Sequence, residues 1–435
     1  MTKSFLQKEG LSIILIFFFA TLGNRYGSSL ILKGVVLLIA FCILTSNVEH
    51  AFCWAVLLVP NIRLLNGIGY SFIVNILMAL PLVNYLFQFR KISKTSLIGF
   101  LSLLGMELVH DLVLCKLNNF TEILGWTLNI LLCTVILTDP KVHVSKDDVF
   151  SAFSIGIIFS ALSYILSTSS SISFIIRTST RFVGFAGEPN YYALYICLAI
   201  ACILSVSGTK GYKFTVLILL MGIGFLTASK MCILLMAVEL LMIYAQAFNN
   251  AKENRKNKRF LLVTLIGFLI VAVIFRKYLI IVLQTFIRRL GQNFKNGLDL
   301  STLTTKRTDI YLEYLKIIFS NLKCLFWGYG LRYNLYLGMS TGQVAHSTYF
   351  DVLLSWGVVG SIIFFVLVGV WVSNFKQARG ITKVGAIRLI PIIVLLINFL
   401  DLSCLSAGMF AFVVTIALLQ WLPDSNLVEM GAQVC

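Results

Sequence analysis

Charged residues are scarce in this sequence. Asp, Glu, Lys and Arg make up 12% of its 435 residues, and hydrophobic residues make up 59%, whereas a soluble domain carries about 25% charged residues. A soluble chain of this length would need many more polar residues to cover its surface. The composition therefore excludes an ordinary water-soluble enzyme and predicts that lipid surrounds most of the chain.

Acidic residues are the scarcer of the two signs of charge. The sequence has 18 Asp and Glu against 35 Lys and Arg, a net charge of +17. In a soluble protein this excess would point to nucleic acid as a partner. In a membrane protein the cations must first be assigned to a side, because basic residues gather in cytoplasmic loops. We therefore expect the lipid bilayer as a partner and no nucleic acid.

Metal-binding motifs are also missing. The ten cysteines fall mostly inside apolar runs, with no CxxC pair and no Cys/His spacing typical of a zinc site. The sequence has no Asp-x-Asp motif, which argues against a metal-bound nucleotide-sugar donor of the usual cytoplasmic type. We expect no metal and no cofactor.

Long apolar runs are abundant. About 20 apolar residues cross a bilayer as a helix, which satisfies its own backbone where water is absent. Residues 1–435 are therefore predicted to form a single membrane domain, an all-α polytopic integral membrane helical bundle of about 12–14 transmembrane helices. The predicted spans lie at residues 11–23, 29–46, 51–66, 69–88, 95–114, 121–138, 149–167, 190–207, 214–228, 229–247, 260–275, 347–373, 388–402 and 404–421.

Basic clusters give these spans an orientation. With the N-terminus in the cytoplasm, alternation of the spans places the compact Lys and Arg clusters inside, as expected for a multi-pass protein of the bacterial cytoplasmic (inner) membrane. The clusters lie at residues 90–94, 141–146, 210–213, 252–259 and 376–388. The first span follows Lys3 and Lys8 and has no clear cleavage site, so it is interpreted as a signal anchor.

Two large segments remain outside, the first large outer loop at residues 168–189 and the second at residues 276–346. Together they hold twelve cations and four acids, which runs against the inside bias of basic residues. Two explanations are open. The loops lie along anionic lipid headgroups, or they hold a multiply charged anion such as a phosphate group.

The second outer loop is predicted to contain an amphipathic helix over residues 305–322, with Thr305 as its N-cap. Lys306 and Arg307 then fall in the first turn, where cations oppose the helix dipole. A bound anion between these side chains and the backbone N–H groups would make the arrangement favourable.

Each outer loop ends in a polar segment. Residues 177–193, RTSTRFVGFAGEPNYYA, combine two arginines, two glycines, a carboxylate and a proline directly before a predicted helix. Residues 326–360, FWGYGLRYNLYLGMSTGQVAHSTYFDVLLSWGVVG, contain a GxG turn, Arg332 and then His346. Such a density of polar groups at the membrane surface indicates a functional site.

These elements resemble the O-antigen ligase and polymerase (Wzy-like) superfamily of polytopic membrane glycosyltransferases. The matching stretches are RFVGFAGEPNYYA (181–193), KRTDIYLEYLKIIFSNLKCLFWGYG (306–330) and AHSTYFDVLLSWGVVG (345–360). The resemblance implies that a glycan moves from an undecaprenyl-diphosphate carrier to an acceptor hydroxyl on the outer face of the membrane. Donor and acceptor would both be carrier-linked glycans, and a chain-length regulator and a flippase are protein partners that such a system can include.

The chemistry implied by the resemblance suits the basic residues. Arginines would stabilise the diphosphate leaving group, with Arg181 and Arg307 as first choices and Arg177 and Arg332 next. His346 is the candidate base for the acceptor hydroxyl. Glu188 is the rival base or the group that orients the acceptor sugar. The aromatic side chains that could stack on sugar rings are Tyr191, Tyr311 and Tyr329.

Polymerase and ligase differ in acceptor and not in chemistry. A polymerase joins repeat units into O-antigen, capsule or exopolysaccharide, whereas a ligase moves the finished glycan to a lipid core. Many relatives have His-Asn where this chain has His346-Ser347, and this departure, with the predicted spans and the two separate outer loops, favours the polymerase.

A third reading is transport, with the chain acting as a polysaccharide flippase. Ionisable residues inside spans are candidate transport groups, and Glu107, His110 and Asp111 share one helix face. Against transport, the sequence shows no repeated half and no matched pair of broken helices. The alternative for this face is a structural role near the outer surface. Lys230 is a further cation that could reach that surface.

Overall fold

The computed structural model describes most of the chain as helix. The described residues are 4–68, 73–88, 94–110, 112–113, 120–168, 181–206, 209–227, 229–251, 307–331, 333, 346–404 and 409–422, with isolated residues between 252 and 306. Every regular element in these ranges is helical, and none is a strand. The predicted all-α class is therefore confirmed for the part of the chain that is described.

Most helices of the first half coincide with predicted apolar runs, and two of the runs are divided. The helices of this half are α1 (Phe5–Tyr26), α2 (Ser29–Thr45), α3 (Val48–Leu58), the 3-10 turns η1 (Val59–Asn61) and η2 (Asn66–Ile68), α4 (Ile73–Ala79), α5 (Pro81–Phe87), α6 (Lys94–His110), α7 (Phe120–Thr138) and α8 (Lys146–Ser167). Side chains cap several of them: Ser28, Asn47 and Ser145 each accept a hydrogen bond from a backbone N–H of the first turn.

The second half contains both short and long helices. They are α10 (Pro189–Cys202), the 3-10 turn η4 (Ile203–Ser205), α11 (Lys210–Leu226), α12 (Lys230–Ala251), α16 (Arg307–Ser320), α17 (Leu322–Trp327), α19 (Thr348–Ala378), α20 (Ala386–Phe399) and α21 (Phe410–Leu419). The range predicted for one amphipathic helix, 305–322, thus holds α16 and the first residue of α17, and Thr305 lies outside the described residues.

Three of the described helices are long and apolar enough to cross a membrane: α1, α8 and α19. Shorter apolar helices of 10–17 residues accompany them, among them α2, α10, α11, α20 and α21. The composition and these helices together indicate a membrane protein.

Two predicted spans are interrupted at prolines. The span predicted at 51–66 was wrong as one helix, because α3 ends at Leu58 and Pro60 lies in the 3-10 turn that follows. The span predicted at 69–88 is divided in the same way, with Pro81 as the first residue of α5. Proline lacks the N–H that a continuing helix needs, so the regular α-helical hydrogen bonding is interrupted at both places.

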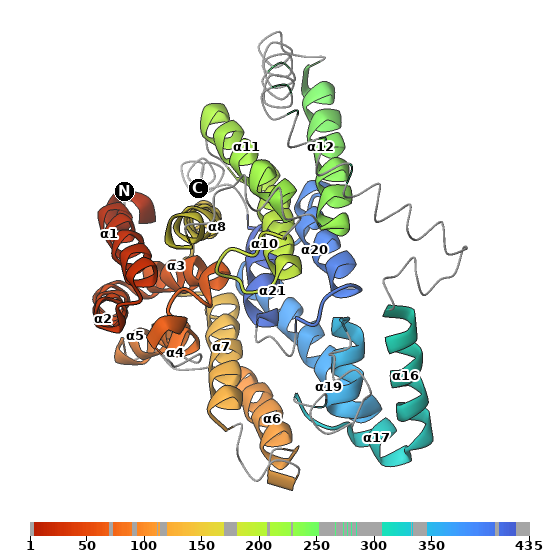
Figure 1. Ribbon diagram of the computed structural model, residues 1–435. Coiled ribbons are helices and arrows are strands. Elements are labelled where there is room, and N and C mark those ends of the chain that lie inside the picture. Colours follow the sequence, from red (N-terminus) through yellow and green to blue (C-terminus); the bar gives the residue numbers. More distant parts are fainter. Residues whose placement is uncertain are drawn as a thin grey trace, which may run out of the picture.

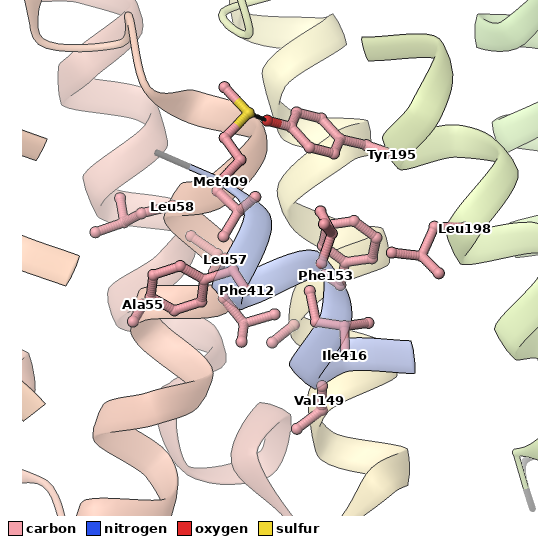
Figure 2. Close-up of a cluster of buried hydrophobic side chains, with 14 of the residues drawn as sticks. Ala55, Leu57, Leu58, Val149, Phe153, Tyr195, Leu198, Met409, Phe412 and Ile416 are labelled. Carbon is pink, nitrogen blue, oxygen red and sulfur yellow. Dashed lines mark hydrogen bonds between the residues drawn. The ribbon is translucent and has the colours of Figure 1, made fainter. Parts of the chain in front are cut away.

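The helices pack around α10 and α21, which lie near the middle of the molecule (Figure 1). Helix α10 contacts α8, α11, α12 and α20, and α21 contacts α7 and α20. Figure 2 shows this core, in which Phe412 and Ile416 of α21 meet Phe153 of α8 and Leu57 of α3. The Tyr195 hydroxyl, from α10, donates to the Met409 sulfur, so that the core also fixes the start of α21.

Helices α16 and α17 form a second, smaller cluster beside α19 at one margin of the molecule (Figure 1). Its buried side chains are Ile310, Tyr314, Ile318, Tyr333 and Leu354. The predicted amphipathic stretch therefore buries one face against the start of α19, and leaves Phe319 and Leu322 exposed.

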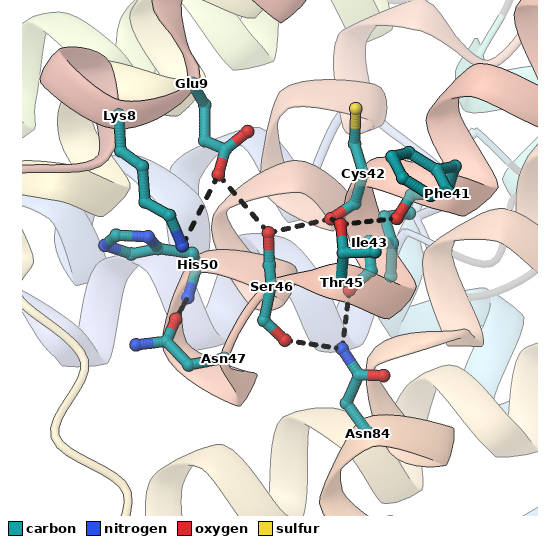
Figure 3. Close-up of polar contacts among 10 residues, drawn as sticks. All are labelled: Lys8, Glu9, Phe41, Cys42, Ile43, Thr45, Ser46, Asn47, His50 and Asn84. Carbon is teal, nitrogen blue, oxygen red and sulfur yellow. Dashed lines mark hydrogen bonds and ion pairs between the residues drawn. The ribbon is translucent and has the colours of Figure 1, made fainter.

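A polar cluster joins α1, α2 and α5 at one end of the bundle (Figure 3). The Ser46 hydroxyl lies 3.4 Å from Glu9 Oε1 and 2.7 Å from the Cys42 carbonyl oxygen. The Asn84 side chain donates to the carbonyls of Ile43 and Ser46. Buried carbonyls at the end of α2 are satisfied in this way, which accounts for a buried asparagine in a helix of apolar residues.

Candidate functional site

The polar segment before α10 is held in place by backbone contacts. The Phe182 N–H donates to the Leu226 carbonyl at 3.1 Å, and the Phe185 N–H donates to the Ser160 hydroxyl at 2.9 Å. Gly184 and Gly187 have φ of +50° and +86°, a backbone region that favours glycine. The two glycines let residues 181–188 fold tightly against α8 and the end of α11.

Arg181, Asn190 and Glu188 form one hydrogen-bonded chain at the start of α10. Arg181 Nε donates to the Thr227 carbonyl at 3.2 Å, and Arg181 Nη2 donates to Asn190 Oδ1 at 2.5 Å. Asn190 Nδ2 in turn donates to Glu188 Oε1 at 3.2 Å. Glu188 is the N-cap of α10 and Pro189 is its first residue. The guanidinium and the carboxylate are thus oriented by one shared amide.

The turn between α20 and α21 connects this chain to the start of α19. The Tyr191 hydroxyl donates to the Ser403 carbonyl at 3.0 Å. The Thr348 hydroxyl donates to the Leu402 carbonyl at 2.6 Å and accepts from the Cys404 N–H at 3.0 Å. Residues 399–404, which we call the bridging turn, therefore lie between the two sequence elements, which are about 150 residues apart in the chain.

His346 stands directly before α19 in a strained conformation. It is the one non-glycine with positive φ among the described residues, at +49°, a value that non-glycine residues rarely adopt. Ser347 is the N-cap of α19, and its hydroxyl donates to the Phe399 carbonyl of the bridging turn at 3.3 Å. The Tyr311 hydroxyl lies 3.2 Å from the His346 carbonyl oxygen and 3.0 Å from that of Leu400. Helix α16 and the bridging turn together fix the position of His346.

A buried acid lies one turn into α19. Asp351 is fully buried and accepts a hydrogen bond from the Tyr333 hydroxyl. The Tyr333 ring meets the Tyr314 ring edge to face, with 5.8 Å between their centroids. Burial, followed by the charges of Asp351 and Glu313, raises the pKa of Tyr314 above its ordinary value, so that this phenol is neutral at physiological pH.

The glycines of the second element serve backbone packing. Gly357 breaks α19 with φ +61° and ψ −168°. The Tyr329 and Gly330 N–H groups donate to the carbonyls of Leu354 and Ser355 at 2.8 and 2.7 Å, which the break leaves outside the regular helix pattern. A Cβ added to Gly357 or Gly328 would lie 2.4 Å from backbone of the other segment. The GxG turn and Gly357 therefore have a structural role, because they let two backbone segments pack closely.

The three tyrosines predicted to bind sugar differ in their surroundings. Tyr191 and Tyr311 both contact the bridging turn, and Tyr311 also stacks on Phe350 with ring centroids 4.8 Å apart. Tyr329 lies farther along the α17–α19 contact, where Asn321 donates to its hydroxyl at 3.3 Å. Contacts to the bridging turn are therefore shared by Tyr191 and Tyr311, whereas the described contact of Tyr329 is to Asn321.

The side chains of three predicted arginines lie outside the described part of the structure. Arg177 and Arg332 lie outside the described residues, and Arg307 is described only by its backbone, as the first residue of α16. Lys230 is the first residue of α12 and is half-buried.

The acidic face of α6, considered above as a transport feature, contacts the GxG turn. The Trp356 indole N–H and the Leu331 N–H both donate to Glu107, the latter at 3.3 Å. His110 Nε2 lies 2.9 Å from the Trp327 carbonyl oxygen. Asp111 lies outside the described residues. Glu107 and His110 therefore have structural partners, which favours the structural reading of this face.

Sequence reasoning missed three components of the site. Asn190 is the amide between Arg181 and Glu188, Asp351 is the buried acid in the first turn of α19, and Ser403 belongs to the bridging turn. The Pro-Asn pair after Glu188 was a usable signal for Asn190, since an asparagine at the second residue of an apolar helix is costly to bury without partners. The bridging turn had no signal, because its role depends on tertiary packing.

The sequence matches no protein-family model and no curated protein.

Proposed function

We propose that this protein is a polytopic membrane glycosyltransferase that polymerises undecaprenyl-diphosphate-linked oligosaccharide repeat units on the outer face of the bacterial cytoplasmic membrane. The product would be O-antigen, capsule or exopolysaccharide. The observation that supports the proposal is the bridging turn, which is contacted by Tyr191, next to Asn190 of the Arg181–Asn190–Glu188 chain, and by Ser347, next to His346. These groups supply what the transfer needs, a cation for a diphosphate and a base for a hydroxyl.

The proposed reaction is a displacement at the anomeric carbon of the donor glycan. The acceptor hydroxyl oxygen forms the new glycosidic bond while the bond from the anomeric carbon to the diphosphate oxygen breaks. His346 accepts the proton of the acceptor hydroxyl. The carrier diphosphate leaves with the bonding electron pair. The transfer balances without a redox partner.

Arg181 stabilises the departing diphosphate in this mechanism. The Thr227 carbonyl and the Asn190 amide hold its guanidinium in one orientation, and a guanidinium matches diphosphate oxygens with parallel N–H donors. Arg177, Arg307 and Arg332 are proposed to contribute further positive charge. Because arginines supply this charge, the proposed reaction requires no metal.

Glu188 is best suited to orient the acceptor sugar. Its carboxylate is tied through Asn190 to the cation that binds the donor, so that donor and acceptor would be aligned by one rigid unit. The rings of Tyr191 and Tyr311, fixed through their hydroxyls on the bridging turn, are proposed to stack on sugar.

Deletion of the gene in its host separates the candidate functions. The polymerase predicts surface glycan limited to single repeat units. A ligase predicts loss of attached glycan with lipid-linked polymer accumulating, and a flippase predicts carrier-linked repeat units accumulating in the cytoplasm. Surface glycan of normal chain length in the deletion strain would overturn the polymerase.

A further inference from the structure

Arg63 follows the early end of α3. Because α3 stops at Leu58, Arg63 lies in the turn between η1 and η2 and is exposed. Asparagines hold this turn on both sides. Asn61 donates to the carbonyls of Leu57 and Gly156 at 2.9 and 3.0 Å, and Asn24 donates to the Leu64 carbonyl at 2.8 Å. The backbone that carries Arg63 is therefore rigidly placed.

The Arg63 side chain lies against the glycine that precedes Glu188. The Arg63 N–H donates to the Phe185 carbonyl at 2.8 Å. A Cβ added to Gly187 would lie 2.1 Å from Arg63 Nε and 2.5 Å from Cζ, distances at which atoms overlap. Gly187 also has φ +86°. Glycine at position 187 thus leaves the space that the guanidinium occupies.

This cation has no acidic partner within the described part of the chain. Among the residues that the structure describes, Lys8 and Glu9 form an ion pair at 3.8 Å, and Arg63 forms none. No ion pair in the described part of the chain explains why an arginine occupies this rigid turn, next to the glycine that precedes Glu188. A guanidinium so placed is suited to bind an anion from outside the protein.

We propose that Arg63 is a further side chain that binds the carrier diphosphate, in addition to Arg181. This inference rests on the proposed function, from which it takes the ligand. The ligand chemistry is a diphosphate ester at the membrane surface, which the guanidinium binds through two N–H donors. An anionic lipid headgroup offers related chemistry, and the experiment must distinguish the two.

The test is native mass spectrometry of the full-length chain in detergent, titrated with undecaprenyl diphosphate and separately with phosphatidylglycerol. Arg63→Gln removes the charge, and Arg63→Lys keeps the charge but loses the planar donors. Arg25→Gln is the matched control, because Arg25 is an exposed arginine in the last turn of α1, close in the fold to Asn24 and its partner Leu64.

A second pair of variants tests the position of the Arg63 side chain without substituting Arg63. Gly187→Ala places a methyl group where the guanidinium lies. Gly27→Ala is its control, because Gly27 has a similar positive φ of +62° and a Cβ there meets nothing within 4 Å. Gly187→Ala should weaken diphosphate binding and Gly27→Ala should not, although both carry the backbone strain.

We expect Arg63→Gln to weaken binding of undecaprenyl diphosphate by about tenfold or more, as for loss of a charge-assisted hydrogen bond, with phosphatidylglycerol binding unchanged. The affinity of Arg63→Lys for undecaprenyl diphosphate should lie between that of the wild type and that of Arg63→Gln. Unchanged diphosphate binding in Arg63→Gln, or an equal loss in Arg25→Gln, would overturn the role of Arg63 while leaving the proposed function intact. A loss of binding confined to phosphatidylglycerol would make Arg63 a lipid-headgroup contact and would also overturn its role in diphosphate binding. A wild-type protein that does not prefer the diphosphate would contradict the proposed function itself.

Discussion

Asn190 is the residue on which the order of the site depends most. It accepts from Arg181 and donates to Glu188, so one amide sets the distance between the proposed diphosphate cation and the acceptor-orienting carboxylate. Neither charged group needs to change for the site to fail. Misplacement of either by about 1 Å is enough to lower a rate by about 100-fold.

Asn190→Ala should therefore lower turnover by about 100-fold while costing only about 1–3 kcal/mol of stability. Asn84→Ala is the matched control, since Asn84 is also a buried asparagine with two hydrogen-bond partners but belongs to the cluster of Figure 3. Its stability loss should be similar and its turnover normal. Chain-length analysis of the glycan and thermal unfolding in detergent measure both quantities. Equal turnover in the two variants would contradict the role of Asn190.

Tyr311 fixes His346 through a single hydroxyl. Tyr311→Phe keeps the ring that stacks on Phe350 but removes the contacts to the carbonyls of His346 and Leu400. We expect about a tenfold loss of turnover with about 1 kcal/mol of lost stability. Tyr349→Phe is the control, because that hydroxyl lies 3.3 Å from the Leu396 carbonyl oxygen of α20, outside the bridging turn. A loss of turnover shared by both variants would show that His346 does not depend on Tyr311.

Residue types at the site were partly predictable. Arg181, Glu188 and His346 stand out in an apolar sequence because a polar side chain at a membrane surface needs a reason. The roles of Asp351 and Arg63 are harder to predict, although each is a charged residue within a predicted span. Only the fold brings Asp351 to Tyr333 and Arg63 to Gly187. Their roles depend on contacts between distant segments, which periodicity does not encode.

At the scale of elements, the break in α19 organises the second half of the site. Gly357 turns the helix so that the carbonyls of Leu354 and Ser355 accept hydrogen bonds from Tyr329 and Gly330. These contacts join α17 to α19, and α16 packs on the same cluster through Tyr314. The predicted helix at 347–373 agrees with the start of α19, which continues to Ala378. The break was missed because a glycine inside an apolar run has several causes.

Gly357→Ala should destabilise the protein by at least about 2 kcal/mol, because alanine is strained at positive φ and its methyl group would overlap the Phe326 backbone at 2.4 Å. Gly369→Ala, in the same helix, is the control: a Cβ there meets nothing within 4 Å, and alanine is the better helix former by about 1 kcal/mol. Thermal unfolding should move down for the first variant and remain or move up for the second. Equal midpoints would show that α19 continues unbroken through residue 357.

At the scale of the whole molecule, contacts between helices agree with a bundle that has two distinct ends, one predicted outside the membrane and one inside. Residues predicted in outer loops or near the outer ends of spans meet one another, as Asn24 meets Leu64 and His110 meets Trp327. Residues predicted inside do the same: the Phe5 N–H donates to Asp148 at 3.0 Å and Arg388 donates to the Trp421 carbonyl at 3.3 Å. Apolar runs and basic clusters predict such a division, because both follow from the cost of placing charge in lipid.

Cysteine labelling checks which end faces out. Asn66 and Lys383 are exposed at opposite ends of this division. A membrane-impermeant maleimide added to intact cells should label Asn66→Cys, and should label Lys383→Cys only after permeabilisation, with the unmodified chain as the blank. The reverse pattern would place the Arg181–Asn190–Glu188 chain in the cytoplasm, away from a donor exposed on the outer face.

The most direct measurement is synthesis by the purified protein. Undecaprenyl-diphosphate-linked repeat units of defined structure are incubated with the protein in chelator, and the products are separated by size. A ladder of increasing chain length is expected from the wild type, with the ladder abolished in Arg181→Ala and in His346→Gln while Arg25→Gln retains it. Absence of a ladder from folded wild-type protein, or a full ladder from both site variants, would contradict polymerisation at this site.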